Sequence, residues 1–377
     1  MGGFIPVNEP LLDGNEERYL VECIRSGWIS SEGPFVSRFE EEFAARVGRR
    51  YGVSVTNGTA ALDAAIVALG IGPGDEVILP TFTIISCVQQ IVRSGATPVF
   101  VDSDPATWCM DVSLVEANIT ARTKAVMAVH IYGMPVDMDP LLQLAKIHDL
   151  RVIEDAAESI GGLYKGRPCG SFGDVSTVSF YANKHVTTGE GGMVLTDDAE
   201  LAERLRSLRN LCFEKERFIH QELGWNLRMT NVQAAIGLAQ LERLDHFVDL
   251  KRNMALRYRE NLSATPNLRL PIDSADYAHN VYWVFGILLP RLNGVDASDI
   301  AQRLASHGVG TRRFFFPLHR QPVLNRLGYG VGEVHPVANT LRDQGIYLPS
   351  GLALSMEQVD RVSEVLDSVL RELDVGA

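Results

Sequence analysis

Residues 150–159 read LRVIEDAAES, a short run with Val152 and Ile153 that ends in two carboxylates, Asp155 and Glu158. A short apolar run followed by polar residues predicts a buried strand with its carboxyl end near a ligand site. Runs of the same kind occur before and after it, at 51–56, 75–80, 97–102, 123–130, 174–180 and 191–197. Amphipathic stretches at 59–70, 86–95 and 138–149 separate several of them, so we expect an α/β fold with a large, mostly parallel sheet and crossover helices.

The second half of the chain has a different pattern. Residues 231–262 are helical in pattern but too long for one ordinary globular helix, so we expect a turn near His246. After it come a predicted strand, a helix, an arginine-aromatic loop and a final helix, at 281–289, 297–308, 311–319 and from Ser355. We therefore expect a large domain over 1–250 and a smaller C-terminal α+β domain over 251–377.

Composition excludes several classes of protein. The 377 residues include 35 basic and 47 acidic side chains, a formal charge of -12, which argues against nucleic acid or an anionic membrane as the partner. Five scattered cysteines suit a reducing compartment, and nine dispersed histidines show no metal-ligand spacing, so no catalytic metal is expected. No secretory leader or membrane-spanning stretch is evident, and a cytoplasmic location is expected.

The stretch SVTNGTAALDAAI at 54–66 runs from a predicted strand into a predicted helix. Asn57, Gly58 and Thr59 lie at the junction, where free backbone N–H groups and a hydroxyl can face an anion. This makes a candidate phosphate cradle. An ordinary strand-to-helix turn at Asn-Gly explains the same residues equally well.

Asp155 directly follows the predicted strand at 151–155, with Glu158 three residues later. A carboxylate in this place can pair with a protonated ring nitrogen and raise the affinity of that nitrogen for its proton. The alternative is a helix cap at a strand end.

Lys184 is the single lysine of SFYANKHVTTGEGGMV at 179–194, a loop between two predicted strands. A partly desolvated lysine can have a lowered pKa and act as a nucleophilic amine toward a carbonyl group. A solvated surface charge is the common alternative for a loop lysine. His185, its neighbour, is expected to pack rather than to move protons.

Together, the cradle, the Asp-x-x-Glu pair and the loop lysine resemble, in this order, the sugar aminotransferases of the DegT/DnrJ/EryC1 family, which have the aspartate-aminotransferase fold. The likeness covers nearly the whole chain, in motifs at 13–44, 57–83, 129–140, 152–162, 170–180, 183–193, 226–245 and 347–355. It implies pyridoxal 5'-phosphate (PLP) as cofactor.

Residue by residue, the resemblance implies that Lys184 bonds covalently to PLP, that Asp155 holds the pyridine nitrogen and that Glu158 lies near the PLP hydroxyl. Gly58, Thr59 and Ser179 would hold the phosphate. Asn226 would reach the cofactor of a neighbouring subunit, which implies a homodimer with two shared sites. The family often has an aromatic residue where this chain has Ile84, so aliphatic packing is expected to replace ring stacking there.

For the reaction, the resemblance implies transfer of an amino group from glutamate to a nucleotide-linked 4-keto-6-deoxy sugar. The motifs GWISS, VHIYG and TTGEGG are most similar to those of members that aminate GDP-4-keto-6-deoxy-D-mannose to GDP-perosamine. The alternatives are a 3-keto sugar or a UDP- or dTDP-linked one, a dehydratase of the same fold, and a PLP-binding regulator without turnover. Candidate diphosphate contacts are Arg228, Arg312, Arg313 and His319, with ordinary ion pairs as the alternative.

Overall fold

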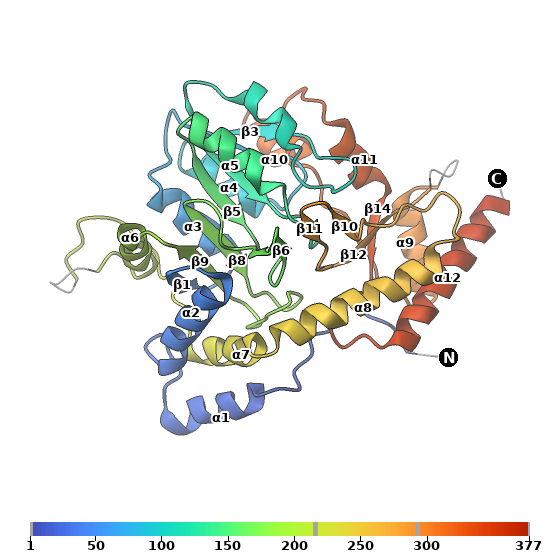
Figure 1. Ribbon diagram of the computed structural model, residues 1–377, viewed down its shortest axis with the longest axis horizontal. Coiled ribbons are helices and arrows are strands. Elements are labelled where there is room, and N and C mark those ends of the chain that lie inside the picture. Colours follow the sequence, from blue (N-terminus) through green and yellow to red (C-terminus); the bar gives the residue numbers. More distant parts are fainter. Residues whose placement is uncertain (1–2, 214–217, 291–294, 376–377) are drawn as a thin grey trace.

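The computed structural model describes residues 3–213, 218–290 and 295–375 (Figure 1). Its main feature is a seven-stranded sheet in the order β1-β9-β8-β5-β4-β2-β3, and six strands are parallel while β9 alone runs against its neighbours. The strands are β1 Tyr51–Val55, β2 Glu76–Pro80, β3 Thr97–Val101, β4 Thr123–Val129, β5 Arg151–Asp155, β8 Val175–Ser179 and β9 Gly192–Thr196. All seven runs expected from the sequence are strands, and the predicted fold class is confirmed.

Helices pack against this sheet. They are α1 Glu16–Ser26, α2 Pro34–Val47, α3 Gly58–Ala68, α4 Ser86–Arg93, α5 Met138–Ile147 and α6 Ala199–Arg209. Of these, α3, α4 and α5 lie in one hydrophobic cluster and α1 and α2 in a second. α3 packs on β8 and β9, while α2 packs on β1 and on α7 (Asn231–Leu241). The central strands β2, β4 and β5 are almost wholly buried because helices cover them, as expected for parallel strands.

The C-terminal part is built on a three-stranded antiparallel sheet, β12-β14-β13, with β12 Phe285–Leu288, β13 Arg312–Arg313 and β14 Gly345–Leu348. The helices that follow α7 are α8 Leu244–Leu262, α9 Ala297–Ser306, α10 Pro322–Arg326, α11 Pro336–Gln344 and α12 Met356–Val375. α12 packs along α8 on the right of Figure 1.

Two local expectations need correction. The helical stretch at 231–262 contains the expected turn, but at residues 242–243, between α7 and α8, a few residues before His246. The strand expected at 281–289 covers only Phe285–Leu288; before it, the backbone N–H of Val281 donates to the carbonyl of Gly133, and the carbonyl of Val281 accepts from the His185 ring. The predicted domain boundary at residue 250 falls inside α8 and stays a prediction.

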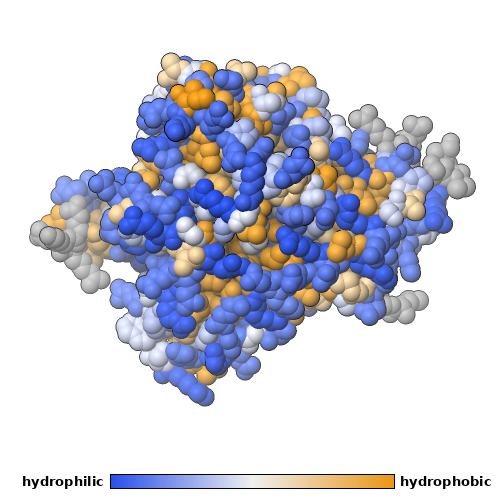
Figure 2. Space-filling model, viewed as in Figure 1, coloured by the Kyte–Doolittle hydropathy of each residue, from blue (hydrophilic) through white to orange (hydrophobic). Residues whose placement is uncertain are grey.

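Hydrophilic residues cover most of the face seen in Figure 2, with hydrophobic ones scattered between them. Within the described ranges, none of the helices combines the length and the apolar character that crossing a membrane requires. Six strand ends meet at one edge of the main sheet, since β1, β2, β3, β4, β5 and β8 are parallel. This edge therefore collects the polar residues that follow those strands.

Candidate active site

Lys184 lies in the loop between β8 and β9, at the edge where the parallel strands end. It is only 9% exposed, and its Nζ lies 3.6 Å from the centre of the Trp283 ring. Burial lowers the pKa of Lys184, although nearby Glu158 and Asp155 act in the opposite direction. A buried lysine of this kind fits the nucleophilic amine expected from the sequence and excludes the solvated alternative.

Segment 281–283 fixes the loop on both sides of Lys184. The indole Nε1–H of Trp283 donates to the carbonyl of Asn183 at 3.0 Å. His185 donates from Nε2 to the carbonyl of Val281 at 2.9 Å, and burial lowers the pKa of His185 to about 3. His185 is therefore a neutral packing residue, as expected, and Trp283 is a site residue that the sequence did not single out.

Asp155 ends β5 and is 4% exposed. Its Oδ1 accepts the N–H of Ala157 at 3.0 Å, and its Oδ2 accepts the thiol of Cys87 at 3.3 Å. Burial raises the pKa of Asp155. Turns follow Asp155 instead of a helix, so the helix-cap alternative is wrong. A buried carboxylate is stabilised when a cation lies beside it.

Glu158 is buried beside the same lysine. Its Oε2 accepts the backbone N–H of Tyr132 at 2.9 Å, and burial raises its pKa to about 7. Glu158 and Asp155 both act to raise the pKa of buried Lys184, and Lys184 acts to lower the pKa of each, so the structure brings these three predicted residues into one buried group.

The candidate phosphate cradle lies at the start of α3. The side chain of Asn57 accepts the N–H of Ala60 at 2.8 Å and caps the helix. A Cβ at Gly58 would come within 2.7 Å of the Cβ of Ser179, so only glycine lets these two segments meet. Thr59 Oγ1 lies 2.8 Å from the Oγ of Ser86, a hydroxyl that the sequence analysis missed.

Ile84 lies in the turn just before α4 and is 45% exposed in the single chain. Its neighbour Thr83 has its Oγ1 3.3 Å from the Sγ of Cys87, the thiol that reaches Asp155. This places Ile84 on the turn beside the carboxylate. Its packing against a cofactor ring stays a prediction.

Asn226 and Arg228 lie on a segment beside β1. The N–H of Thr56 donates to the carbonyl of Leu227 at 2.9 Å, so the segment adjoins the turn that forms the cradle. Asn226 is exposed, whereas Arg228 donates to the Oδ1 of Asn210 at 2.6 Å. The exposure of Asn226 leaves it available to a second chain.

Arg312 and Arg313 face opposite sides of β13. Arg312 pairs in register with Tyr347, whose ring lies 6.4 Å from that of Trp283, so Arg312 is on the side of Lys184. Arg313 instead donates to the carbonyl of Arg342 at 2.7 Å. Of the two, Arg312 is the better candidate for an anionic ligand.

Two further polar side chains, His319 and Arg342, lie in the C-terminal part of the chain. His319 is 3% exposed and bonds to Thr81, the residue after β2. Arg342, which the sequence analysis missed, lies with its guanidinium 5.5 Å from the Phe316 ring centre, and among the described residues its Nη1 has no hydrogen-bond partner. Such an orphaned donor suits an anion.

Within the described ranges, one buried cluster, His130, Glu154 and Cys169, has metal-ligating atoms within 4.8 Å of one another. The carboxylate of Glu154 already accepts from His130 Nε2 and from the backbone N–H groups of Gly170 and Phe172, at 2.7–2.9 Å. We interpret the cluster as a hydrogen-bond network that holds the loop after β5. The absence of a catalytic metal stays an expectation.

Taken together, the edge of the sheet provides what PLP requires. Lys184 would offer an amine for its carbonyl group, Asp155 would offer a carboxylate for its ring nitrogen, and the close contact of Gly58 with Ser179 at the start of α3 would form the phosphate cradle. These residues come from different strands and meet only in the folded chain.

Comparison with known proteins agrees with this fit. The GDP-perosamine synthase of Escherichia coli O157:H7 is 44% identical over 365 residues, covering 97% of this chain and 98% of that protein, and that of Caulobacter vibrioides is 42% identical with the same coverage. Among solved structures, this chain is similar to the putative sugar aminotransferase Spr1654 of Streptococcus pneumoniae, which is known in PLP and PMP forms. The match to the PMP form has a TM-score of 0.91 and 27% identity over 99% of each chain. The aminotransferase TlmJ of Streptoalloteichus hindustanus also matches at 0.91, with 34% identity over 98% of this chain and 100% of that one.

The family model that matches describes the DegT/DnrJ/EryC1/StrS aminotransferase family and spans residues 10–367. The buried lysine, the paired carboxylates and the cradle occur within that span, in the order expected. The chain therefore belongs to the DegT/DnrJ/EryC1/StrS aminotransferase family and is a PLP-dependent sugar aminotransferase.

Proposed function

We propose that this enzyme moves an amino group from glutamate to C4 of GDP-4-keto-6-deoxy-D-mannose and so forms GDP-perosamine. The observation that carries the proposal is the buried group of Lys184, Asp155 and Glu158 at the sheet edge. The two relatives named GDP-perosamine synthase support the choice of sugar nucleotide, since they match over nearly their whole length.

When bound, PLP supplies an electron sink for the amino carbon, and this sink requires a positive charge on its ring nitrogen. Asp155 would stabilise that charge because it is a buried carboxylate at the end of β5. Gly58, Thr59, Ser86 and Ser179 hold the phosphate end. Thr83 and Cys87 keep Asp155 oriented through the thiol hydrogen bond.

Lys184 carries the proton between the substrate carbon and the cofactor carbon. Burial lowers the pKa of Lys184, so its amine is neutral more readily than an exposed lysine and can accept a proton before returning it. The anchors at Asn183 and His185 keep Nζ over the Trp283 ring while it does so. Arg312 lies on the same side and is placed to receive the carboxylate of glutamate or the diphosphate of the sugar nucleotide.

The active unit is a homodimer in this proposal, in the cytoplasm. Tyr181 and Ile84, on either side of the cradle region, are 47% and 45% exposed in the single chain, and exposed apolar side chains beside a site favour cover by a partner. Asn226 would then reach the cofactor phosphate of the neighbouring chain. Mixing inactive Lys184→Ala chains with inactive Asn226→Ala chains tests this, because only mixed dimers regain one intact site.

Random mixing should restore roughly a quarter of the wild-type sites. No recovered activity after subunit exchange, verified by mass-tagged chains, would contradict the shared site. A mixture whose activity only equals the sum of the residual activities of the two variants would also contradict the shared site.

A dehydratase of this fold has histidine at the lysine position, whereas this chain has Lys184 there, with histidine only at 185. A regulator without turnover would bind PLP but release no keto acid. Incubation with glutamate alone separates these cases: the transaminase converts PLP to the pyridoxamine form and releases an equal amount of 2-oxoglutarate.

Lys184→Ala should release no 2-oxoglutarate in that assay while its circular dichroism stays that of the wild type. The matched control is Lys165→Ala, which removes a surface lysine paired with Asp139 at 2.5 Å and should keep full activity. Turnover in the Lys184→Ala protein would overturn the assignment. Offering GDP-, UDP- and dTDP-linked 4-keto sugars to the wild type then tests the acceptor.

A further inference from the structure

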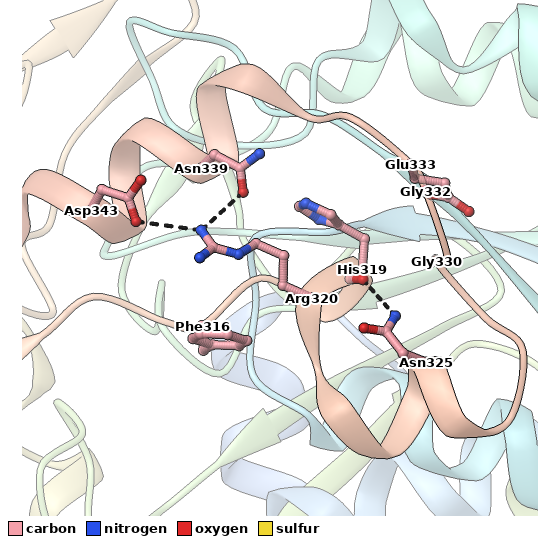
Figure 3. A pocket seen from close by; sticks show the side chains of 9 residues that line it. All are labelled: Phe316, His319, Arg320, Asn325, Gly330, Gly332, Glu333, Asn339 and Asp343. Carbon is pink, nitrogen blue, oxygen red and sulfur yellow. Dashed lines mark hydrogen bonds and ion pairs between the residues drawn. The ribbon is translucent and has the colours of Figure 1, made fainter.

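An open pocket of about 690 Å³ lies between the η3 turn Leu318–Arg320, α10 and α11 (Figure 3), and none of its lining residues belongs to the loop of Lys184. This volume is in the range of small-molecule sites. The side chains that line it combine an aromatic ring, hydrogen-bond donors and carboxylates, and include Phe316, His319, Arg320, Glu333, Asn339 and Asp343. Among these, only His319 is a candidate from the sequence, as a diphosphate contact.

His319 presents a buried donor to the pocket. The Oγ1 of Thr81 accepts the backbone N–H of His319 at 3.1 Å and lies 2.7 Å from Nδ1, so the single hydroxyl proton of Thr81 is free to go to Nδ1. Nε2 then carries the ring proton. Within the described ranges Nε2 has no partner of hydrogen-bond geometry, although the amide of Asn339 is near enough to affect the pKa of His319. Burial lowers this pKa to about 4, so the ring is neutral at physiological pH.

Phe316 and Asp343 are held next to each other by Arg320. The guanidinium of Arg320 lies 5.3 Å from the centre of the Phe316 ring, and its Nη1 is 3.3 Å from Asp343 Oδ1. The Asp343 side chain remains 64% exposed, so it can accept further hydrogen bonds. Figure 3 shows the His319 ring between Asn339 on one side and Glu333 on the other.

The pocket is close to the cofactor site. Thr81 contacts His319, and Thr83 contacts Cys87, which donates to Asp155. Thr81 and Thr83 are two residues apart, and two residues of extended chain span about 7 Å. The pocket and the cofactor site therefore contact opposite ends of one short segment. A sugar nucleotide with its sugar at Lys184 can therefore extend its nucleotide toward the pocket.

We propose that this pocket binds the guanine base of the sugar nucleotide, an inference that rests on the proposed function. Guanine has adjacent donors at N1 and N2 and acceptors at O6 and N7. The Asp343 carboxylate accepts from the two donors, His319 Nε2–H donates to an acceptor, and Phe316 packs on the ring plane.

Asp343 would also distinguish guanine from uracil or thymine. Those bases have one N–H between two carbonyls, so they can satisfy only one bond to a carboxylate and bring carbonyl oxygens close to it. A polar group left unpaired in a site is costly, and this cost excludes the wrong base.

Calorimetric titration of the PLP-loaded enzyme with GDP and with UDP tests the inference without turnover. GDP should bind the wild type more tightly than UDP. Asp343→Asn should lower the affinity for GDP by at least about tenfold, as expected when a base contact of two hydrogen bonds is lost. Its affinity for UDP should stay almost unchanged. His319→Leu should also lower the affinity for GDP. Thermal unfolding of this variant is measured to exclude a folding defect.

Glu42→Gln is the matched control. Glu42 is a half-exposed carboxylate on α2 that pairs with Arg38 at 3.4 Å and does not line the pocket, so GDP affinity should stay within about twofold of the wild type. Equal GDP affinity of the wild type and Asp343→Asn, or equal loss in both carboxylate variants, would overturn the base assignment. In that case amination of the GDP-linked sugar by the wild type would still uphold the proposed function, whereas amination of UDP- or dTDP-linked sugars alone would overturn the proposed acceptor.

Discussion

The Nζ of Lys184 lies 3.6 Å from the centre of the Trp283 ring, and the indole N–H of Trp283 donates to the carbonyl of Asn183, the residue before the lysine. One side chain thus supports both the amine and the backbone that carries it. The backbone of Trp283 is held in turn by buried Lys251, which donates to the Trp283 carbonyl at 3.0 Å and to that of Ser350. The position of the lysine therefore depends on a residue from the C-terminal half of the chain.

Trp283→Phe keeps an aromatic face beside Lys184 but removes the donor to Asn183. We expect kcat in the glutamate half-reaction to fall by about tenfold with little change in KM, because loss of one hydrogen bond costs on the order of 1 kcal/mol and misplaces Nζ. Trp28→Phe, at a residue 49% exposed and outside this network, is the control. An unchanged kcat would show that the indole hydrogen bond does not position the lysine.

Glu158→Gln should change how stability depends on pH. Burial raises the pKa of Glu158 from 4.5 to about 7, so between these values the native state holds a proton that the unfolded chain releases. Its contribution is therefore fully present below pH 4.5 and is lost as pH rises toward 7. In urea unfolding of the PLP-free protein, the free energy of unfolding of the wild type should fall by up to about 3 kcal/mol relative to that of Glu158→Gln between these two pH values. Parallel pH profiles would contradict this.

Gly58→Ala should reduce PLP affinity by at least about tenfold, because the new Cβ would lie 2.7 Å from the Cβ of Ser179 and push the cradle apart. Gly72→Ala is the matched control, since its nearest neighbour outside the adjoining residues would be 3.8 Å away. Fluorescence titration of the PLP-free proteins measures both. Equal affinities would mean that the cradle tolerates a side chain.

Arg312→Ala and Arg313→Ala should have different effects. Arg312 is exposed and faces the Tyr347 side, so its loss should raise KM for glutamate or the sugar nucleotide without lowering the melting temperature. Arg313 donates to the carbonyls of Arg342 and Asp343, so its loss should lower stability by roughly 1–3 kcal/mol and leave KM nearly unchanged. The reverse pattern would contradict the placement of the two side chains.

The strands of the main sheet were predictable because their apolar runs are short and regularly separated. The relation of Asp155 and Lys184 to these strands was predictable too, since both follow runs that end at one edge. Trp283, Cys87, Ser86 and Arg342 were not, because each reaches the site from another segment and has no distinctive neighbours in sequence. Arg313 was grouped with Arg312 because sequence alone does not say which side of a two-residue strand faces the site.

Amino transfer from glutamate to the sugar can be followed directly with labelled nitrogen. The enzyme is loaded with PLP and given glutamate labelled with ¹⁵N together with GDP-4-keto-6-deoxy-D-mannose, and the product is examined by NMR and mass spectrometry. Each product molecule should carry one ¹⁵N atom bonded to C4 of the sugar, and one 2-oxoglutarate should be released with it. A sugar product without nitrogen, or label at C3, would contradict amino transfer to C4.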